Sequence, residues 1–131
     1  SNFKKNKLIV KKIFLYSNIL LFGAFLIVIL FGNSLISYLN QSLQLIDKHI
    51  LMILCFIVFL ELNHSISAMI ITTLNKVPFR NASVISSIGI VLAQISVVED
   101  YQILGLILSI GVINLIYNNW KWPYYCYKEF N

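Results

Sequence analysis

The sequence predicts an all-α, polytopic membrane protein with four transmembrane helices and one amphipathic helical segment. Hydrophobic residues make up 59% of its 131 residues and charged residues only 11%, whereas soluble domains carry about 25% charged residues. The mean hydropathy is +0.82. Four apolar stretches approach the ~20 residues that a helix needs to cross a bilayer. We therefore expect a single membrane domain over residues 1–131.

The first predicted span covers residues 13–31 and contains Asn18. Lys11 and Lys12 before it resemble the start of a secretory signal, but the apolar run is too long and has no small-residue cleavage site. Lipid cannot satisfy backbone amides, so we expect an α-helix here and in every other span.

Residues 33–49 follow with helical periodicity. Leu35, Leu39, Leu43 and Ile46 fall on one face, while Asn40, Gln44 and Asp47 fall on another. This pattern indicates either an amphipathic helix on the outer membrane surface or an outward extension of the second span.

The second predicted span covers residues 50–74, which is 25 residues or about 37 Å of helix. Its eleven leading apolar residues are interrupted by Glu61, which we expect near the bilayer midplane. A carboxylate there costs about 2.5–3.5 kcal/mol on insertion scales, and such residues usually face protein or a water cavity. Glu61 is therefore the strongest functional lead in the chain.

The third and fourth spans are predicted at residues 82–98 and 101–120, after a break marked by Pro78. The third span contains several serine, glycine and alanine residues, and this composition is typical of closely packed helices. Residues 121–131 are predicted to form a cytoplasmic tail. The aromatic run 118–125 indicates an interfacial belt in which the Lys121 side chain reaches toward the headgroups.

The distribution of charge predicts the orientation of the chain. If the four spans alternate, nine of the ten basic residues fall on one side and only Lys48 falls on the other. The positive-inside rule then places both termini in the cytoplasm. This placement explains the net charge of +5 without nucleic acid, so we expect none as a partner.

A polar stripe on the second span is the candidate site. On a helix, Glu61 and His64 share one face, and Asn63 widens it. A glutamate and a histidine one turn apart can share a proton, which favours a cavity-facing site for a proton, a cation or a polar substrate. The alternative is that these groups hydrogen-bond to neighbouring helices and only hold the bundle together.

Two further residues join the list of candidates. Gln94, in the third span, is a candidate for the same cavity. Asn114, in the fourth, is a candidate for a buried hydrogen bond, and Gly111 one turn earlier leaves room for it.

Sequence patterns of catalysis are missing. The chain has no glycine-rich phosphate loop, no paired-cysteine metal motif and no nucleophile elbow. We therefore expect no enzymatic activity, no cofactor and no bound metal. Cys55 lies in a span and Cys126 in the tail, so we expect both to be reduced.

Two segments carry a resemblance to a known family. The sequence FLELNHS at 59–65, followed by IITTLNKVPF at 70–79, resembles the bacterial polysaccharide-export proteins. These are the O-antigen or lipid-linked oligosaccharide flippases of the multidrug/oligosaccharidyl-lipid/polysaccharide (MOP) superfamily. The resemblance is strongest over 59–93 and returns over 105–123, which includes YNNWKWP.

The resemblance implies a function and a location. Members of this family flip undecaprenyl-pyrophosphate-linked glycans across the bacterial inner (cytoplasmic) membrane by alternating access, often coupled to an H⁺ or Na⁺ gradient. This chain would be the end of the second lobe. Its partners would be the bilayer, the lipid-linked glycan and the missing N-terminal helices of the same protein. Glu61, Asn63 and His64 would face the cavity between the lobes.

Two other functions stay open. A stand-alone small multidrug transporter also has four helices and one membrane glutamate, but that glutamate typically lies in the first helix, and residues 13–31 have none. The chain could also be a membrane assembly subunit without transport activity, in which the polar stripe binds partner helices.

Overall fold

The computed structural model describes residues 2–40 and 44–130, and this part of the chain is helical without strands. Three helices follow in order, α1 (Asn2–Leu39), α2 (Lys48–Thr72) and α3 (Arg80–Phe130). All three are long and apolar enough to cross a membrane, by length and composition. The all-α prediction is confirmed for these residues, and the length and apolarity of the helices are what a membrane protein requires. Three such helices stand where the sequence predicted four spans.

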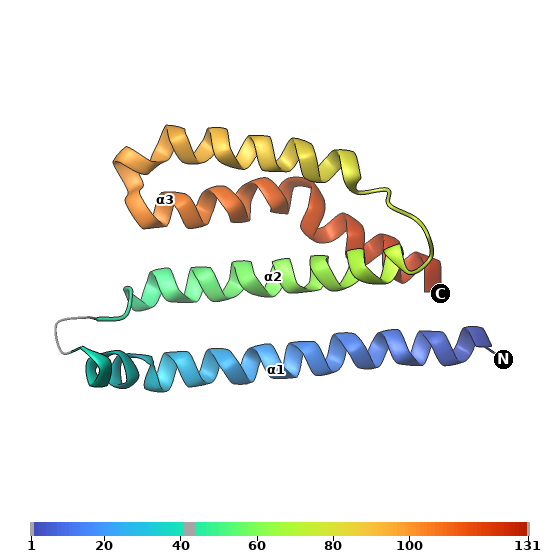
Figure 1. Ribbon diagram of the computed structural model, residues 1–131, viewed down its shortest axis with the longest axis horizontal. Helices are drawn as coiled ribbons and strands as arrows, with labels where there is room; N and C mark the ends of the chain where they lie inside the picture. The colour runs from blue at the N-terminus through green and yellow to red at the C-terminus, as the bar shows by residue number, and fades with distance from the viewer. Residues whose placement is uncertain (1, 41–43, 131) are drawn as a thin grey trace.

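The difference arises because α3 reverses direction. Gln102 has φ 48° and ψ −128°, a conformation that interrupts the helix. Figure 1 shows the ribbon folding back there, so that residues 80–101 (the first leg) and 103–130 (the second leg) run antiparallel. The legs pack closely, because a Cβ atom added at Gly89 would lie 3.6 Å from the Ile113 Cγ2 atom. They correspond to the regions where the sequence predicted the third and fourth spans.

The connection between α1 and α2 differs from expectation. Residues 33–39 complete α1, and α2 begins only at Lys48, where the Asp47 carboxylate accepts a hydrogen bond of 2.8 Å from the His49 amide. Among the described residues, 33–49 is therefore neither a separate amphipathic helix nor an extension of α2. No proline stops α1 after residue 31, so its backbone hydrogen bonds continue. Residues 41–43, which include Leu43, lie outside the described part.

The break after α2 lies where the sequence placed it. Helix α2 ends at Thr72 and α3 begins at Arg80, so Pro78 falls in the connection. Cys55 and Cys126 are both free thiols, as expected.

The buried core lies between α2 and the end of α3. Ile66, Ile70 and Ile71 pack against Trp122 and Cys126. Trp122 is only 2% exposed. Residues 121–130 belong to helix α3. The indole of Trp122 belongs to the core, not to an interfacial belt. Pro123 lacks an N–H and disturbs the preceding turn, and Figure 1 shows the last turns of α3 stepping toward α2.

Other parts of the aromatic run fit the predicted belt. Trp120 and Tyr124 are exposed. The Lys121 ammonium lies 3.9 Å from the centre of the Tyr117 ring and donates a hydrogen bond to its hydroxyl.

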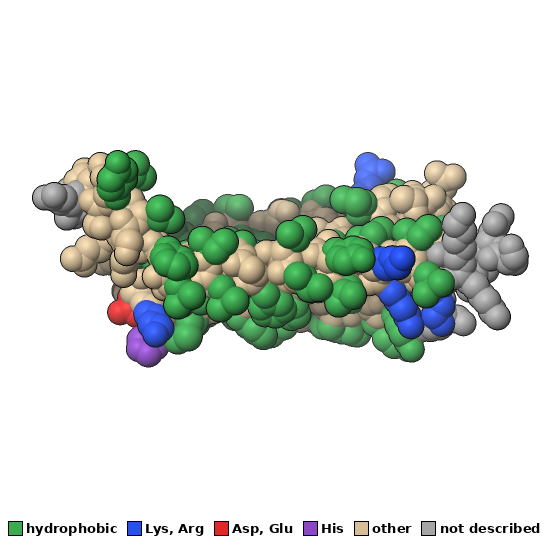
Figure 2. Space-filling model, turned by 90° about the horizontal axis from the view of Figure 1, so that it is seen from below, with side chains coloured by type: hydrophobic (Ala, Val, Ile, Leu, Met, Phe, Trp, Pro, Cys, Tyr) green, Lys and Arg blue, Asp and Glu red, His purple; other side chains and the backbone are tan. Residues whose placement is uncertain are grey.

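Both termini lie at one end of the bundle, together with the connection between α2 and α3 (Figure 1). There, the Lys76 ammonium forms an ion pair of 2.9 Å with Glu129, which is 53 residues away in the chain. Lysine and arginine side chains gather at this end, whereas a basic side chain lies with an acidic and a histidine side chain at the other (Figure 2). The helices therefore bring most of the basic side chains seen in this view to one end.

Helix α2 and the second leg pack tightly at Gly111. A Cβ atom there would lie 2.5 Å from the Ile57 Cδ1 atom and 2.7 Å from its Cγ1 atom. At Gly23 in α1, by contrast, a Cβ atom would meet nothing within 4 Å. Only the first of these glycines is required by packing.

We predict that Gly111→Ala lowers the stability of the bundle by about 1–3 kcal/mol, the usual result of overpacking. Gly23→Ala is the matched control, and it should leave stability unchanged or raise it, because alanine favours helix. Thermal unfolding in detergent measures both. Ile57→Ala should partly rescue Gly111→Ala, and equal effects of the two glycine substitutions would contradict the close approach.

A second prediction concerns the ion pair at the basic end. The hydrogen bond from Lys76, and then that from Tyr125, holds the pKa of the Glu129 carboxyl below its ordinary value. Since this pKa is depressed, the contact is complete above the ordinary value and is lost as pH falls through the lowered pKa. Lys76→Gln should move the pKa of Glu129 upward in an NMR titration, whereas Lys12→Gln should not. An unchanged Glu129 titration in Lys76→Gln would show that the ion pair does not form.

Candidate functional site

The polar stripe of α2 makes hydrogen bonds to both neighbouring helices. The Asn114 amide nitrogen, in the second leg, donates a bond of 2.8 Å to the Glu61 Oε1 atom. Asn63 and Asn18 exchange two bonds of 3.1 and 3.2 Å, which join α2 to α1. Glu61 and Asn63 lie close together on α2, and they connect this helix to two different helices, α3 and α1.

The bond to Glu61 is the end of a longer row. The Trp122 indole N–H donates to the Asn118 Oδ1 atom at 3.0 Å, and the Asn118 amide donates to the Asn114 Oδ1 atom at 3.1 Å. The same Asn118 amide donates to the Ser86 hydroxyl at 2.8 Å, which includes the first leg of α3. We call these five residues the asparagine ladder. From Trp122 onward, each side chain in this row donates a hydrogen bond to the next one nearer Glu61, and the Glu61 carboxylate is the final acceptor.

Helical spacing explains why the ladder forms. Asn114, Asn118 and Trp122 follow one another at intervals of four residues, so they lie on one stripe of the second leg. All three are buried. Gly111, one turn before Asn114, lets this stripe approach α2 closely. The predicted buried hydrogen bond at Asn114 is therefore present, and Glu61 accepts it.

Two polar groups stay without a partner among the described residues. The His64 Nδ1 atom is buried and makes no hydrogen bond, and neither does the buried side-chain amide of Asn119. Asn119 is 5% exposed. An unsatisfied polar group in a lipid environment costs several kcal/mol, so these atoms favour an additional partner such as water, a ligand or another helix.

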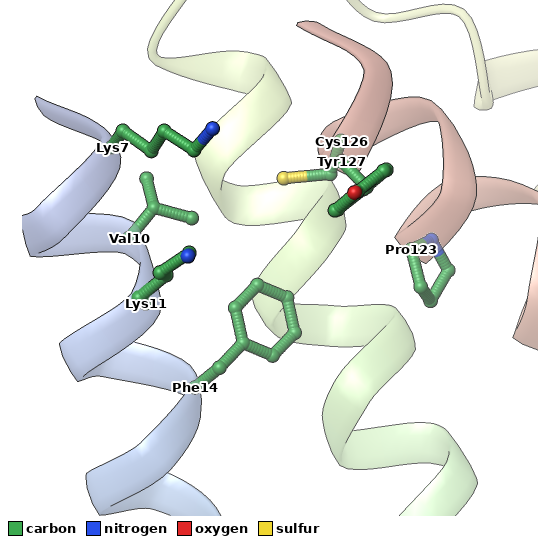
Figure 3. A pocket seen from close by; sticks show the side chains of 7 residues that line it. All are labelled: Lys7, Val10, Lys11, Phe14, Pro123, Cys126 and Tyr127. Atoms are coloured by element: carbon green, nitrogen blue, oxygen red, sulfur yellow. The ribbon is translucent and has the colours of Figure 1, made fainter. Parts of the chain in front are cut away.

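The structure brings together only some of the predicted residues. Glu61 and Asn114 are bonded to each other, Asn63 is bonded to α1, and His64 lies one turn from Glu61. Gln94 is half-buried on the first leg and makes no side-chain hydrogen bond within the described residues. The pocket in Figure 3 is lined by different residues, from the N-terminal part of α1 and the end of α3.

Sequence reasoning missed the ladder members Ser86, Asn118 and Trp122 and, outside the ladder, Asn18; it had assigned Trp122 to an interfacial belt. Asn18, Ser86 and Asn118 each bond a side chain from another segment, yet none was a candidate. The four-residue spacing from Asn114 to Asn118 was the one available signal. For Asn18 and Ser86 the sequence gives no such signal, because their partners are 45 and 32 residues away.

Comparisons with protein-family models, with curated proteins and with solved structures found no match to this chain.

The Asn18–Asn63 pair yields a prediction about how α1 is held. In a double-mutant cycle with Asn18→Leu and Asn63→Leu, we expect a coupling free energy of about 0.6 kcal/mol, and at most about 1.7, as for hydrogen bonds between membrane helices. Reversible unfolding in detergent measures each variant. Gln94→Leu is the control and should cost nothing, since the Gln94 side chain makes no hydrogen bond in the part of the chain that the structure describes. Strictly additive effects of the two asparagine substitutions would show that the pair does not form.

Proposed function

We propose that this chain is a four-span membrane unit of a transporter that flips lipid-linked oligosaccharides across the bacterial inner membrane by alternating access. The observation that carries the proposal is the placement of Glu61. This carboxylate lies midway along α2, is hydrogen-bonded by Asn114, and has the unpartnered His64 nitrogen one turn away. Intramembrane carboxylates of this kind mark ion and substrate pathways. The proposed substrate, a lipid-linked oligosaccharide, follows from the resemblance of the sequence to bacterial polysaccharide-export proteins.

Four spans follow if each leg of α3 crosses the bilayer separately. The first leg, at ~1.5 Å per residue, is roughly 33 Å long, and the hydrocarbon core is about 30 Å thick. The Lys76–Glu129 ion pair supports this count, because it keeps the two ends of α3 at the same end of the bundle. A helix that crossed once would have its ends on opposite sides.

The orientation in the proposal comes from charge. Basic residues gather at the end that holds both termini (Figure 2), and the positive-inside rule assigns that end to the cytoplasm.

Ion coupling would act through the bond between α2 and the second leg. An H⁺ or Na⁺ at Glu61 competes with the Asn114 amide for the same carboxylate. Occupancy by the ion therefore weakens one contact between α2 and α3. A ligand shifts a conformational equilibrium only through such differential contacts, which is what alternating access requires.

A membrane assembly subunit is the second candidate. The observation in its favour is that Asn63 and Glu61 both bond neighbouring helices, as in helices held together by polar residues. A small multidrug transporter is less well supported, because α1 contains no carboxylate.

Glu61→Gln separates transport from a purely structural role. The glutamine carbonyl can still accept from Asn114, although it lacks the charge that strengthens the bond, so the bundle should stay folded with only a small loss of stability. In cells whose surface glycan depends on this protein, we expect export to fall several-fold or more, because the ion would no longer have a carboxylate to bind. Glu99→Gln, outside the predicted spans, is the control and should export normally. Normal export by Glu61→Gln would remove Glu61 from the mechanism and leave the assembly role.

The four-span topology has its own test. In a background without Cys55 and Cys126, Gln102→Cys should react with a membrane-impermeant thiol reagent added outside the cell. Lys76→Cys should react only after the membrane is permeabilised. Labelling of both cysteines from the same side would exclude separate crossings by the two legs.

A further inference from the structure

A pocket of about 320 Å³ lies at the basic end of the bundle, between α1 and the end of α3. Its apolar wall is formed by Val10 and Phe14 of α1 and by Pro123 and Cys126 of α3. Figure 3 shows the Phe14 ring and the Cys126 sulfur facing the space between the two helices. The pocket is partly open, and nothing in the described part of the chain fills it.

Two lysines line the same pocket. Lys7 and Lys11 are one helical turn apart on α1, and their side chains extend toward α3 (Figure 3). Neither forms an ion pair within the described residues, where the Lys76–Glu129 pair uses the nearby carboxylate. The pocket therefore combines an apolar wall with two uncompensated positive charges.

The depth of the pocket matches the boundary between hydrocarbon and headgroups. Phe14 is the second residue of the predicted first span, so its ring lies at the edge of the hydrocarbon. Lys7 lies two turns nearer the N-terminus, about 10 Å along the helix axis. Lys11 lies about 4.5 Å from Phe14 along the same axis, within the headgroup layer of about 5–7 Å that contains the lipid phosphates. The long Lys7 side chain reaches this layer from just outside it.

We propose that this pocket binds an anionic phospholipid from the leaflet at the basic end of the bundle. The lipid phosphate accepts hydrogen bonds from the ammonium groups of Lys7 and Lys11, and one acyl chain lies along Phe14 and Pro123. Basic pockets between transmembrane helices are known to bind anionic headgroups. The inference is independent of the proposed transport, because it needs only that the chain lies in a bilayer.

The chemistry selects a lipid over free phosphate. Inorganic phosphate would satisfy the lysines but leave the wall of Val10, Phe14 and Pro123 uncovered. A neutral phospholipid would cover the wall but bring no net charge to the two ammonium groups. Only an anionic lipid matches both halves of the pocket.

The bound lipid has a structural role as well. Val10 and Phe14 are the α1 side chains that pack against the core cluster, while most large apolar side chains of α1 are exposed. A lipid in the pocket contacts both α1 and the end of α3, so it adds to the few contacts that hold α1 in place.

Photo-crosslinking tests this site directly. The protein is reconstituted in phosphatidylcholine bilayers that contain phosphatidylglycerol with a diazirine in one acyl chain, and labelled peptides are identified by mass spectrometry. We expect adducts at residues 7–14 and 123–127. Lys7→Gln combined with Lys11→Gln should reduce this labelling several-fold. The matched control, Lys12→Gln with Lys128→Gln, removes two charges from the same end outside the pocket and should label normally.

Three outcomes would overturn the proposal. Equal losses in the two double variants would mean that only the general charge of this end attracts the lipid. Equal labelling by a phosphatidylcholine probe would mean that the pocket does not select charge. Competition by inorganic phosphate beyond that of chloride at equal ionic strength would assign the lysines to a free anion. Circular dichroism of both double variants shows whether they keep their helices.

Discussion

The contact between α2 and the second leg of α3 is the interaction on which the rest of the structure depends. It is close because Gly111 has no side chain opposite Ile57, and it is polar one turn later, where Asn114 bonds Glu61. Toward the basic end it becomes apolar, with Ile71 against Trp122. Gly111, the Asn114 amide and the Trp122 indole lie on one stripe of the second leg. One helix face therefore supplies the close, the polar and the apolar contact.

The polar part of this contact follows from the environment that we infer for the chain. Water is absent from a hydrocarbon layer, so a buried amide or carboxylate must find its partner within the protein. The asparagine ladder meets this requirement across α2 and both legs of α3. A network that joins three segments also couples them, because changing the carboxylate alters the bonds that hold its neighbours. Structural and functional roles of Glu61 are therefore not exclusive.

Helix α1 stands apart from this arrangement. One asparagine pair, the contact between the Phe22 and Phe59 rings, a small apolar contact near its N-terminal end and the hydrogen bond from the Leu45 amide to Asn33 hold it to the rest of the chain. Most of its large side chains face outward, which suits a helix surrounded by lipid or by further helices. The uneven attachment leaves the lysine-lined pocket open between α1 and the end of α3.

Several features of the fold could be predicted because they depend on local chemistry. Apolar runs of spanning length predict helices, and Pro78 predicts a break, whatever the rest of the chain does. The polar stripe of α2 was also visible, because residues 61 to 64 interrupt an apolar run. The spans predicted at 82–98 and 101–120 implied a short connection, but the reversal at Gln102 itself was not predicted, since neither proline nor glycine marks the residue that adopts a positive φ.

The amino-acid sequence by itself determined that the chain is helical and apolar, that its basic residues fall at alternating connections, and that Glu61 sits within an apolar segment. Tertiary structure alone decided what each polar group contacts. Asn18 is hydrogen-bonded to Asn63, and Asn118 to Ser86, because the helices pack with particular rotations about their axes and particular offsets along them. It also decided that Trp122 is buried, although its neighbours Trp120 and Tyr124 are exposed. Helical periodicity tells which residues share a face, but the partner that covers a face depends on contacts distant in the chain.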